Sequence, residues 1–246
     1  MNNNAPIWII GPPRSRTKWT VNLFKDIPEH IILNHPSFGI YSPFWWRYNK
    51  IPPLDAIKEI DPILEAGKTP VILRHQFAFS MDWIRNQWPG SKFLIADRDI
   101  MEWLTSVNNF KGGLHFLYKD NGEEQDLPPA YVGRDLISDW WKNADWWQRA
   151  VAHYWAYMGA ALEGYGLDDC AMLYTSNQSK IEDIKSQLSV TWAEKALPNI
   201  STFKPSKLSY KAEFNRSDVE DVLKFLNSAQ PSQWIVTATS SEDEKI

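Results

Sequence analysis

Residues 7–19 read IWIIGPPRSRTKW, and the fold is best approached from this segment. Residues 7–10 are all apolar, which is typical of a short strand buried on both faces. A turn rich in Gly, Pro and Ser follows, and a helical pattern begins at Thr17. In a strand–turn–helix unit, the N–H groups of the turn and the positive end of the helix dipole face the same point. The segment therefore predicts an anion-binding turn.

The side chains of this turn strengthen that prediction. Arg14, Arg16 and Lys18 supply positive charge, and Ser15 and Thr17 supply hydroxyl donors. The Walker pattern G-x-x-x-x-G-K-[ST] is not met, because Arg16 stands at its second glycine and Thr17-Lys18 replaces Lys-Ser/Thr. An ordinary ATPase or GTPase site is therefore not expected. A helix start that merely carries solvated basic residues remains the alternative.

Strand-like and helix-like segments alternate along the chain. Further apolar β-type runs lie at 71–73, 93–96 and 171–174, and helical spacing occurs at 17–25, 54–66, 79–87, 100–108, 135–164 and 178–188. This alternation predicts a single α/β domain over residues 1–246, with a parallel central sheet flanked by helices. Residues 111–133 are rich in Gly, Pro and charge and are predicted to form a flexible lid loop, and residues 238–246 a disordered acidic tail.

Composition excludes several classes of function. The net charge of −4 leaves no excess of positive charge for a nucleic-acid backbone. The one cysteine, Cys170, cannot form an internal disulfide, and the histidines show no ligand spacing, so no metal is expected. The first residues resemble neither a signal peptide nor a membrane span, and we expect a cytoplasmic protein. Its oligomeric state is left open.

Two further segments end in polar residues where a strand is predicted to end. Residues 89–107, PGSKFLIADRDIMEWLTSV, place Arg98 after a strand and Ser106 eight residues later on a helix. Taken alone, Arg98 could bind a phosphate or form an ion pair with a neighbouring aspartate. In VILRHQF, residues 71–77, His75 follows another strand. Parallel strands would bring both residues to the same edge as the first turn, where ligands collect.

These segments resemble sulfotransferases that use 3'-phosphoadenosine 5'-phosphosulfate (PAPS). Their 5'-phosphosulfate loop has the form G-x-P-[RK]-S-G-T-T-W, which is matched by Gly11, Pro13, Arg14, Ser15, Thr17 and Trp19. Arg16 stands where the family has glycine, and Lys18 where it has threonine. Arg98 and Ser106 are similar to the family's pair for the 3'-phosphate. Residues 71–77 resemble V-I-K-T-H-L-P, whose histidine is the general base, and Tyr174 is similar to the tyrosine of Y-E-D-[LM].

The resemblance implies a P-loop-NTPase-like sulfotransferase fold and transfer of a sulfuryl group from PAPS to a hydroxyl or amine of a small acceptor, which leaves PAP. His75 would be the base, and Arg14, helped by Lys18, would neutralise the leaving phosphate. The donor would be bound by Pro13, Arg14, Ser15, Arg16, Thr17, Lys18, Trp19, Arg98, Ser106 and Tyr174. The family's C-terminal segment R-K-G-x-x-G-D-W-K has no clear counterpart here.

Tryptophan is abundant, with 14 residues. Apolar residues recur at helical spacing over 140–162, which favours a core-facing helix over a ligand site. The pair Trp45-Trp46 could line an acceptor pocket, and the acceptor would then be apolar or aromatic. Two other functions remain open. A nucleotide-dependent phosphotransferase would require a Mg²⁺ ligand and usually a Walker lysine, and in a non-catalytic nucleotide-binding protein the tryptophans would form a partner surface.

Overall fold

A five-stranded parallel sheet forms the centre of the computed structural model, which describes residues 4–34, 50–108, 134–174, 181–191 and 215–229. The strands are β1 (Ile7–Ile10), β2 (His30–Asn34), β3 (Thr69–Leu73), β4 (Lys92–Asp97) and β5 (Cys170–Tyr174). They lie in the order β2-β3-β1-β4-β5, and each neighbouring pair is parallel. The predicted fold class, α/β with a parallel sheet flanked by helices, is confirmed.

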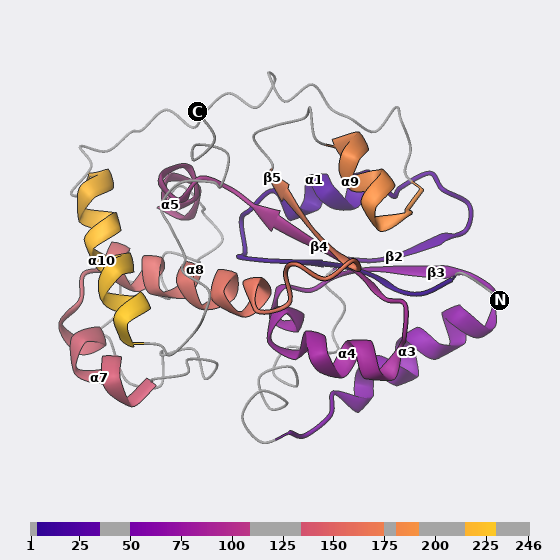
Figure 1. Cartoon of the computed structure of the whole chain (residues 1–246), viewed down its shortest axis with the longest axis horizontal. Coiled ribbons are helices and arrows are strands. Elements are labelled where there is room, and N and C mark those ends of the chain that lie inside the picture. Colours follow the sequence, from indigo (N-terminus) through magenta and orange to yellow (C-terminus); the bar gives the residue numbers. More distant parts are fainter. Residues whose placement is uncertain (1–3, 35–49, 109–133, 175–180, 192–214, 230–246) are drawn as a thin grey trace.

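Helices cover both faces of this sheet (Figure 1). The helices α1 (Thr17–Asn22) and α9 (Ile181–Leu188) lie on one face, and α3 (Leu54–Glu65) and α4 (Met81–Gln87) lie on the other. A 3-10 helix, η1 (His75–Ser80), leads from β3 into α4. The remaining helices extend the molecule beyond one side of the sheet: α5 (Ile100–Asn108), α7 (Arg134–Asn143), α8 (Trp146–Leu162) and α10 (Arg216–Ala229).

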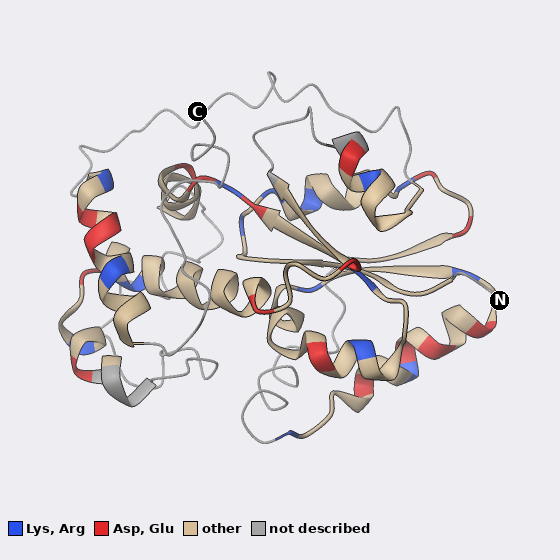
Figure 2. Ribbon diagram, viewed as in Figure 1, with Lys and Arg blue, Asp and Glu red and all other residues tan. Residues whose placement is uncertain are grey.

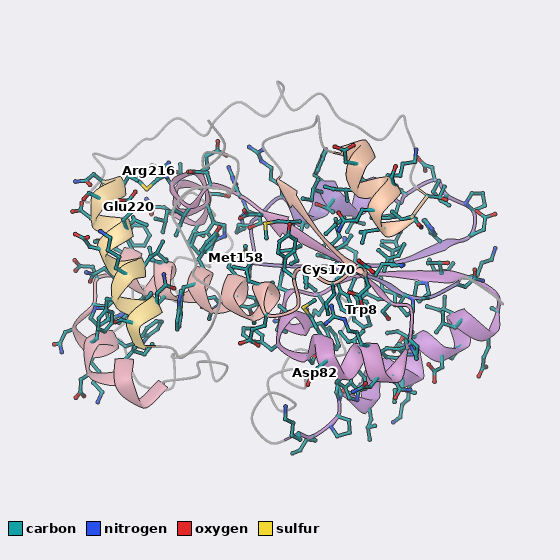
Figure 3. The ribbon with its side chains drawn as sticks, viewed as in Figure 1. Trp8, Asp82, Met158, Cys170, Arg216 and Glu220 are labelled. Atoms are coloured by element: carbon teal, nitrogen blue, oxygen red, sulfur yellow. The ribbon has the colours of Figure 1, made fainter. Side chains whose placement is uncertain are left out.

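Burial on both faces explains the apolar run of β1. Ile7 and Ile9 belong to the apolar cluster under α1 and α9, whereas Trp8 and Ile10 belong to the larger cluster on the other face. Figure 3 shows Trp8 between the sheet and α4. In Figure 2 the strands carry charge only near their ends, while acidic and basic residues are interspersed along the outer helices. Side chains on both faces of a strand pack in this way when helices cover both sides of the sheet.

The helix predicted over residues 135–164 is wrong in one respect, because the chain breaks there into α7 and α8. Asp145 begins α8 with a capping box that it forms with Gln148. A side-chain acceptor at this position satisfies N–H groups that a new helix leaves unpaired. The tryptophan-rich stripe is core as predicted: Trp147, Val151, Tyr154, Trp155 and Met158 are all buried.

Other boundaries also differ from the prediction. The helix expected over 17–25 ends at Asn22, and the one expected over 79–87 begins at Met81, after the 3-10 turn. Strand β2 and helix α10 were not predicted. β2 is at the edge of the sheet, where Ile31 and Asn34 are exposed and the other three residues are only partly buried. The predicted lid loop at 111–133, the tail at 238–246 and Trp45-Trp46 lie outside the described residues.

The strand order brings three loops together. From β1 the chain crosses to β2 on one side, and after β3 it crosses to β4 on the other side of β1. The carboxyl ends of β3, β1 and β4 are therefore adjacent, since Ile9 pairs with Leu73 and Ile10 with Ile95. In open parallel sheets, this point of reversal is where ligands bind.

Candidate functional site

The turn after β1 has an unusual backbone conformation. Three of its residues have positive φ: Gly11 at 113°, Arg14 at 75° and Arg16 at 56°. Only glycine fits at position 11, because a Cβ there would lie 2.6 Å from the Ala96 carbonyl oxygen. At the two arginines the left-handed conformation costs roughly 1–2 kcal/mol per residue. Backbone strain of this kind is concentrated at functional sites.

Ser15 lies inside this turn. Its N–H donates to the Pro12 carbonyl at 3.2 Å, and the residue is fully buried. Among the described residues its hydroxyl has no hydrogen-bond partner. A buried hydroxyl without a partner costs free energy, because it has lost its hydrogen bonds to water. The Ser15 hydroxyl therefore fits a ligand oxygen placed in the turn.

His75 contacts the same turn from the end of β3. Its Nδ1 lies 3.0 Å from the Gly11 carbonyl oxygen, and the residue is 7% exposed. Since a carbonyl can only accept, Nδ1 carries the hydrogen of this bond. In the neutral ring the lone pair is then on Nε2, and this nitrogen can accept a proton. The turn thus fixes the tautomer that a general base requires.

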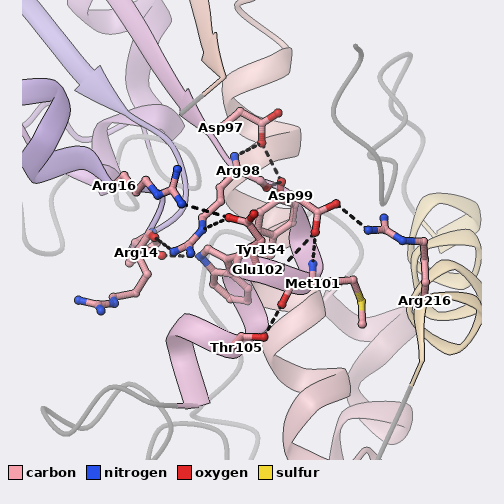
Figure 4. A network of polar contacts seen from close by, with 12 residues as sticks. Arg14, Arg16, Asp97, Arg98, Asp99, Met101, Glu102, Thr105, Tyr154 and Arg216 are labelled. Atoms are coloured by element: carbon pink, nitrogen blue, oxygen red, sulfur yellow. Dashed lines mark hydrogen bonds and ion pairs between the residues drawn. The ribbon is translucent and has the colours of Figure 1, made fainter. Parts of the chain in front are cut away.

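Arg98, the first residue after β4, joins β4 to the turn (Figure 4). Its Nη1 donates to the Arg14 carbonyl at 3.3 Å, and its Nε donates to Glu102 Oε2 at 3.2 Å. The same Glu102 oxygen accepts from Arg16 Nη2 at 3.3 Å. The indole N–H of Trp103 donates to the Pro13 carbonyl. Arg16, which stands at the family's glycine position, therefore belongs to one charged cluster with Arg98.

Burial and like charge act on this cluster. The pKa of Arg14 and that of Arg16 are lowered, first by burial and then by the positive charge of Arg98. The carboxylate of Glu102 opposes this by raising the pKa of Arg16. Figure 4 shows the guanidinium of Arg14 directed away from Glu102, while those of Arg16 and Arg98 meet at it. An anion would relieve the repulsion between the guanidiniums.

Asp97 and Tyr154 hold the backbone of Arg98. Asp97 Oδ1 accepts from the Arg98 N–H at 2.6 Å and lies 2.9 Å from the Tyr154 hydroxyl, which is also 3.0 Å from the Arg98 carbonyl oxygen. Burial raises the pKa of Asp97 to about 6, although the hydrogen bonds from Tyr154 and Arg98 oppose this shift. The Asp97 carboxylate thus holds the N–H of Arg98, and the Tyr154 hydroxyl, which comes from α8, holds its carbonyl.

The remaining predicted site residues lie as follows. Thr17 is buried at the start of α1, and Lys18, the next residue, is exposed. Trp19 is 5% exposed and packs in the cluster under α1 and α9. Ser106 is 8% exposed, on α5. Tyr174 ends β5 and pairs with Asp97 in the sheet, and its side chain lies outside what the structure describes. Pro13 is half-buried in the turn.

Four residues at this edge were missed by sequence reasoning: Arg74, Asp97, Glu102 and Tyr154. Arg74, beside His75, is 9% exposed, and burial lowers its pKa. Glu102 could have been found, because a residue four positions after Arg98 at a helix start is in reach of an ion pair. Tyr154 could not, because it reaches Asp97 across 57 residues of sequence from the middle of an apolar stripe.

Metal clusters and membrane-spanning helices are both absent from the described residues. No group of three or more His, Cys, Asp or Glu side chains in the described ranges is arranged to hold a metal ion. None of the described helices is both long and apolar enough to cross a membrane.

The comparisons with known proteins found likenesses in structure and none in sequence. No protein-family model matches the chain, and no curated protein matches it in sequence. Among solved structures, it is similar to the crystal structure of a sulfotransferase from Alicyclobacillus acidocaldarius, with 12% sequence identity and a TM-score of 0.47 over 91% of each chain. Similarity of this degree leaves the function to be argued from the residues of the site.

Proposed function

We propose that this chain is a sulfotransferase that transfers the sulfuryl group of PAPS to a hydroxyl or amine of a small acceptor and releases PAP. One observation carries the proposal: the Nδ1 of His75 is bound to the carbonyl of Gly11, the first residue of the anion-binding turn. A candidate base of fixed tautomer therefore lies beside the place where the turn would hold a charged group. Sulfuryl transfer requires these two features side by side.

His75 is assigned the role of base. As the acceptor oxygen forms its bond to sulfur, its proton passes to Nε2 of His75, while the hydrogen bond from Nδ1 to Gly11 stabilises the imidazolium that results. The bond from sulfur to the bridging phosphate oxygen breaks, and its electron pair remains on the phosphate. The donor supplies the activated sulfur, and the chain supplies proton transfer and charge neutralisation.

The turn is assigned the reacting end of the donor. The buried Ser15 hydroxyl would donate to an oxygen of the phosphosulfate, and Arg14 would neutralise the charge that grows on the leaving phosphate. Lys18, exposed on α1, is the second candidate cation. These are the residue types that a leaving group of this kind needs, because a phosphate departs without protonation once its charge is balanced.

The far end of the donor is assigned to β4 and α5. Arg98 would bind the 3'-phosphate, with Ser106 as a second donor. Pro13, Arg16, Thr17, Trp19 and Tyr174 are the remaining proposed donor contacts, and Trp19 would have to meet the adenine through the small part of its ring that is exposed. An apolar or aromatic acceptor remains the proposal from Trp45-Trp46, and the cytoplasm remains the proposed location.

The two alternatives make different demands. A phosphotransferase would bind ATP at least as well as PAP and would depend on Mg²⁺. A non-catalytic nucleotide-binding protein would bind PAP without turnover. Thermal shifts measured with PAP, AMP, ADP and ATP, with and without Mg²⁺, distinguish a phosphotransferase from a sulfotransferase. We expect PAP to raise the melting temperature most, without metal, because only PAP carries the 3'-phosphate. A larger shift with ATP and Mg²⁺ would contradict the proposal.

Replacing His75 with Gln tests the base. We expect the rate of sulfuryl transfer to a panel of phenols and amines to fall by a factor of about 10²–10⁴, which is the contribution of a general base. PAP affinity should stay within about threefold, because the glutamine side chain can still donate to the Gly11 carbonyl. His153→Gln, on α8, is the matched control. Unchanged transfer in His75→Gln would remove this residue from the role.

A further inference from the structure

Arg16 is a proposed donor contact with no particular group of the donor assigned to it, and Glu102 has no assigned role, yet the two side chains form an ion pair within the site. Glu102 Oε2 accepts from Arg98 Nε at 3.2 Å and from Arg16 Nη2 at 3.3 Å (Figure 4). Two guanidiniums from different loops therefore converge on one carboxylate oxygen. Guanidiniums converge in this way on the oxygens of phosphates and carboxylates, which their planar N–H groups fit.

The three side chains differ in exposure. The side chains of Arg16 and Arg98 are 13% and 11% exposed, whereas that of Glu102 is 43% exposed. The carboxylate is thus the member of the cluster that faces solvent. It lies on a flexible side chain of α5, and it can turn away into water at small cost, because exposed ion pairs contribute little to stability. The arginines are held more firmly, Arg98 by its bond to the Arg14 carbonyl.

The charges of the cluster do not cancel. Among the residues that the structure describes, two guanidiniums face this carboxylate, and the positive charge of Arg98 lowers the pKa of Arg16 despite the opposing effect of Glu102. A singly charged anion that replaced Glu102 would gain nothing in charge balance. A phosphate dianion would balance both arginines. The cluster is therefore suited to exchange its own carboxylate for a doubly charged phosphate.

We infer that Arg16 and Arg98 together form one phosphate-dianion subsite, in which Glu102 occupies the position of the phosphate until the ligand displaces it. Under the proposed function, on which this reading rests, the dianion is the 3'-phosphate of PAPS, and Arg16 is its second cation. Glu102 then acts as a specificity residue, because every anion that enters must compete with it. Singly charged anions compete poorly, and dianions compete well.

Glu102→Gln tests the competition directly. The amide keeps the size of the side chain and removes the charge. We expect PAP to bind about tenfold more tightly to the variant than to the unaltered chain in isothermal titration calorimetry without metal, and inorganic pyrophosphate to gain similarly. Glu59→Gln is the matched control: it removes the same charge from an exposed position on α3, on the opposite face of the sheet. It should change neither affinity by more than about twofold.

Arg16→Gly tests the second cation. Position 16 has φ 56°, which glycine adopts freely, so the variant should fold. We expect PAP affinity to fall about tenfold and the gain from Glu102→Gln to shrink in the double variant. Weaker or unchanged PAP binding by folded Glu102→Gln would overturn the inference, as would unchanged binding by Arg16→Gly.

The outcomes separate this inference from the proposed function. If PAP binds no better than AMP while Glu102→Gln still binds pyrophosphate more tightly, the proposed function fails and the dianion subsite stands. If PAP is preferred over AMP but Glu102→Gln brings no gain for either probe, the proposed function stands and the inference fails. If neither PAP nor pyrophosphate binds to the unaltered chain or to the variant, both are overturned.

Discussion

Arg149 and Arg98 are both largely covered by the protein but lie in different surroundings. Arg149 of α8 is 6% exposed and donates through Nε to the Trp141 carbonyl at 3.0 Å and through Nη2 to the Lys142 carbonyl at 3.3 Å. Arg98, with 11% of its side chain exposed, has a backbone carbonyl on one side and the half-exposed carboxylate of Glu102 on the other. The partners of Arg149 are fixed parts of helix α7. Under the inference above, the Glu102 carboxylate is the partner of Arg98 that a ligand displaces.

This difference separates a structural charge from a candidate binding charge. Arg149 donates to carbonyls that the last turn of α7 leaves unpaired. These hydrogen bonds form within the folded chain and require no ligand. Arg98 is held by Asp97 and Tyr154 through its backbone, so that its side chain need not anchor the fold. The exposed fractions of the two residues differ little, whereas their partners distinguish them.

The largest expected effect is on stability, at the α7–α8 junction. Arg149→Met should lower the free energy of unfolding by about 3 kcal/mol, because it leaves the buried Trp141 carbonyl and the partly buried Lys142 carbonyl without their charged donor. Urea unfolding followed by tryptophan fluorescence measures this loss. PAP affinity of the folded fraction should not change. A variant of unchanged stability would contradict the structural assignment of Arg149.

The corresponding change at the sheet edge should act on binding. Arg98→Gln should weaken PAP binding about 50-fold, roughly 2.3 kcal/mol, since a charge-assisted contact to a phosphate is lost. Stability should change by less than about 1 kcal/mol, because the bond of Asp97 to the backbone N–H of residue 98 remains. Calorimetric titration with PAP and urea unfolding measure the two quantities. A large loss of stability with unchanged PAP affinity would reverse the comparison between the two arginines.

The smallest expected effect sharpens the role of Asp97. Its pKa is raised from 3.8 to about 6, so between these values the folded chain binds a proton that the unfolded chain has released. The contribution of Asp97 to stability is therefore greatest at low pH and falls as the pH rises through about 6. Asp97→Asn removes this dependence.

Relative to the unaltered chain, the Asp97→Asn variant should be more stable at pH 7.5 than at pH 4.5 by about 2 kcal/mol. Urea unfolding at the two pH values measures this difference. An equal difference in stability at both values would show that the carboxyl of Asp97 titrates normally in the folded chain.

Local patterns predicted the strands that are buried on both faces. The apolar runs at 7–10, 71–73, 93–96 and 171–174 all lie within strands, because helices on both sides of a sheet require apolar residues at every position. The edge strand β2 was missed, although its apolar run, Ile31 to Leu33, is as long as the one at 71–73. The break between α7 and α8 was missed, because periodicity continues across it and only the cap at Asp145 marks it.

The residues of the candidate site also fall into those that local patterns could predict and those that they could not. The turn at 11–16, His75 and Arg98 could be found from sequence, because glycine, basic residues and strand ends are local signals. Asp97, Tyr154 and the contact between Arg16 and Glu102 could not, because their partners are far apart along the chain. Trp19 shows the converse: its place in the motif was visible, but its burial in the core was not.

Local patterns in the sequence were enough to predict the α/β class, the strand that leads into the turn at 11–16, and the residue types at three strand ends, because apolar runs, glycines and charges act over a few neighbours. Which of these residues meet depends on the way the strands are arranged in space. The order β3-β1-β4 places His75 on the Gly11 carbonyl 64 residues away, and Arg16 on Glu102 86 residues away. Contacts over such separations depend on how the sheet is assembled, which no local pattern contains.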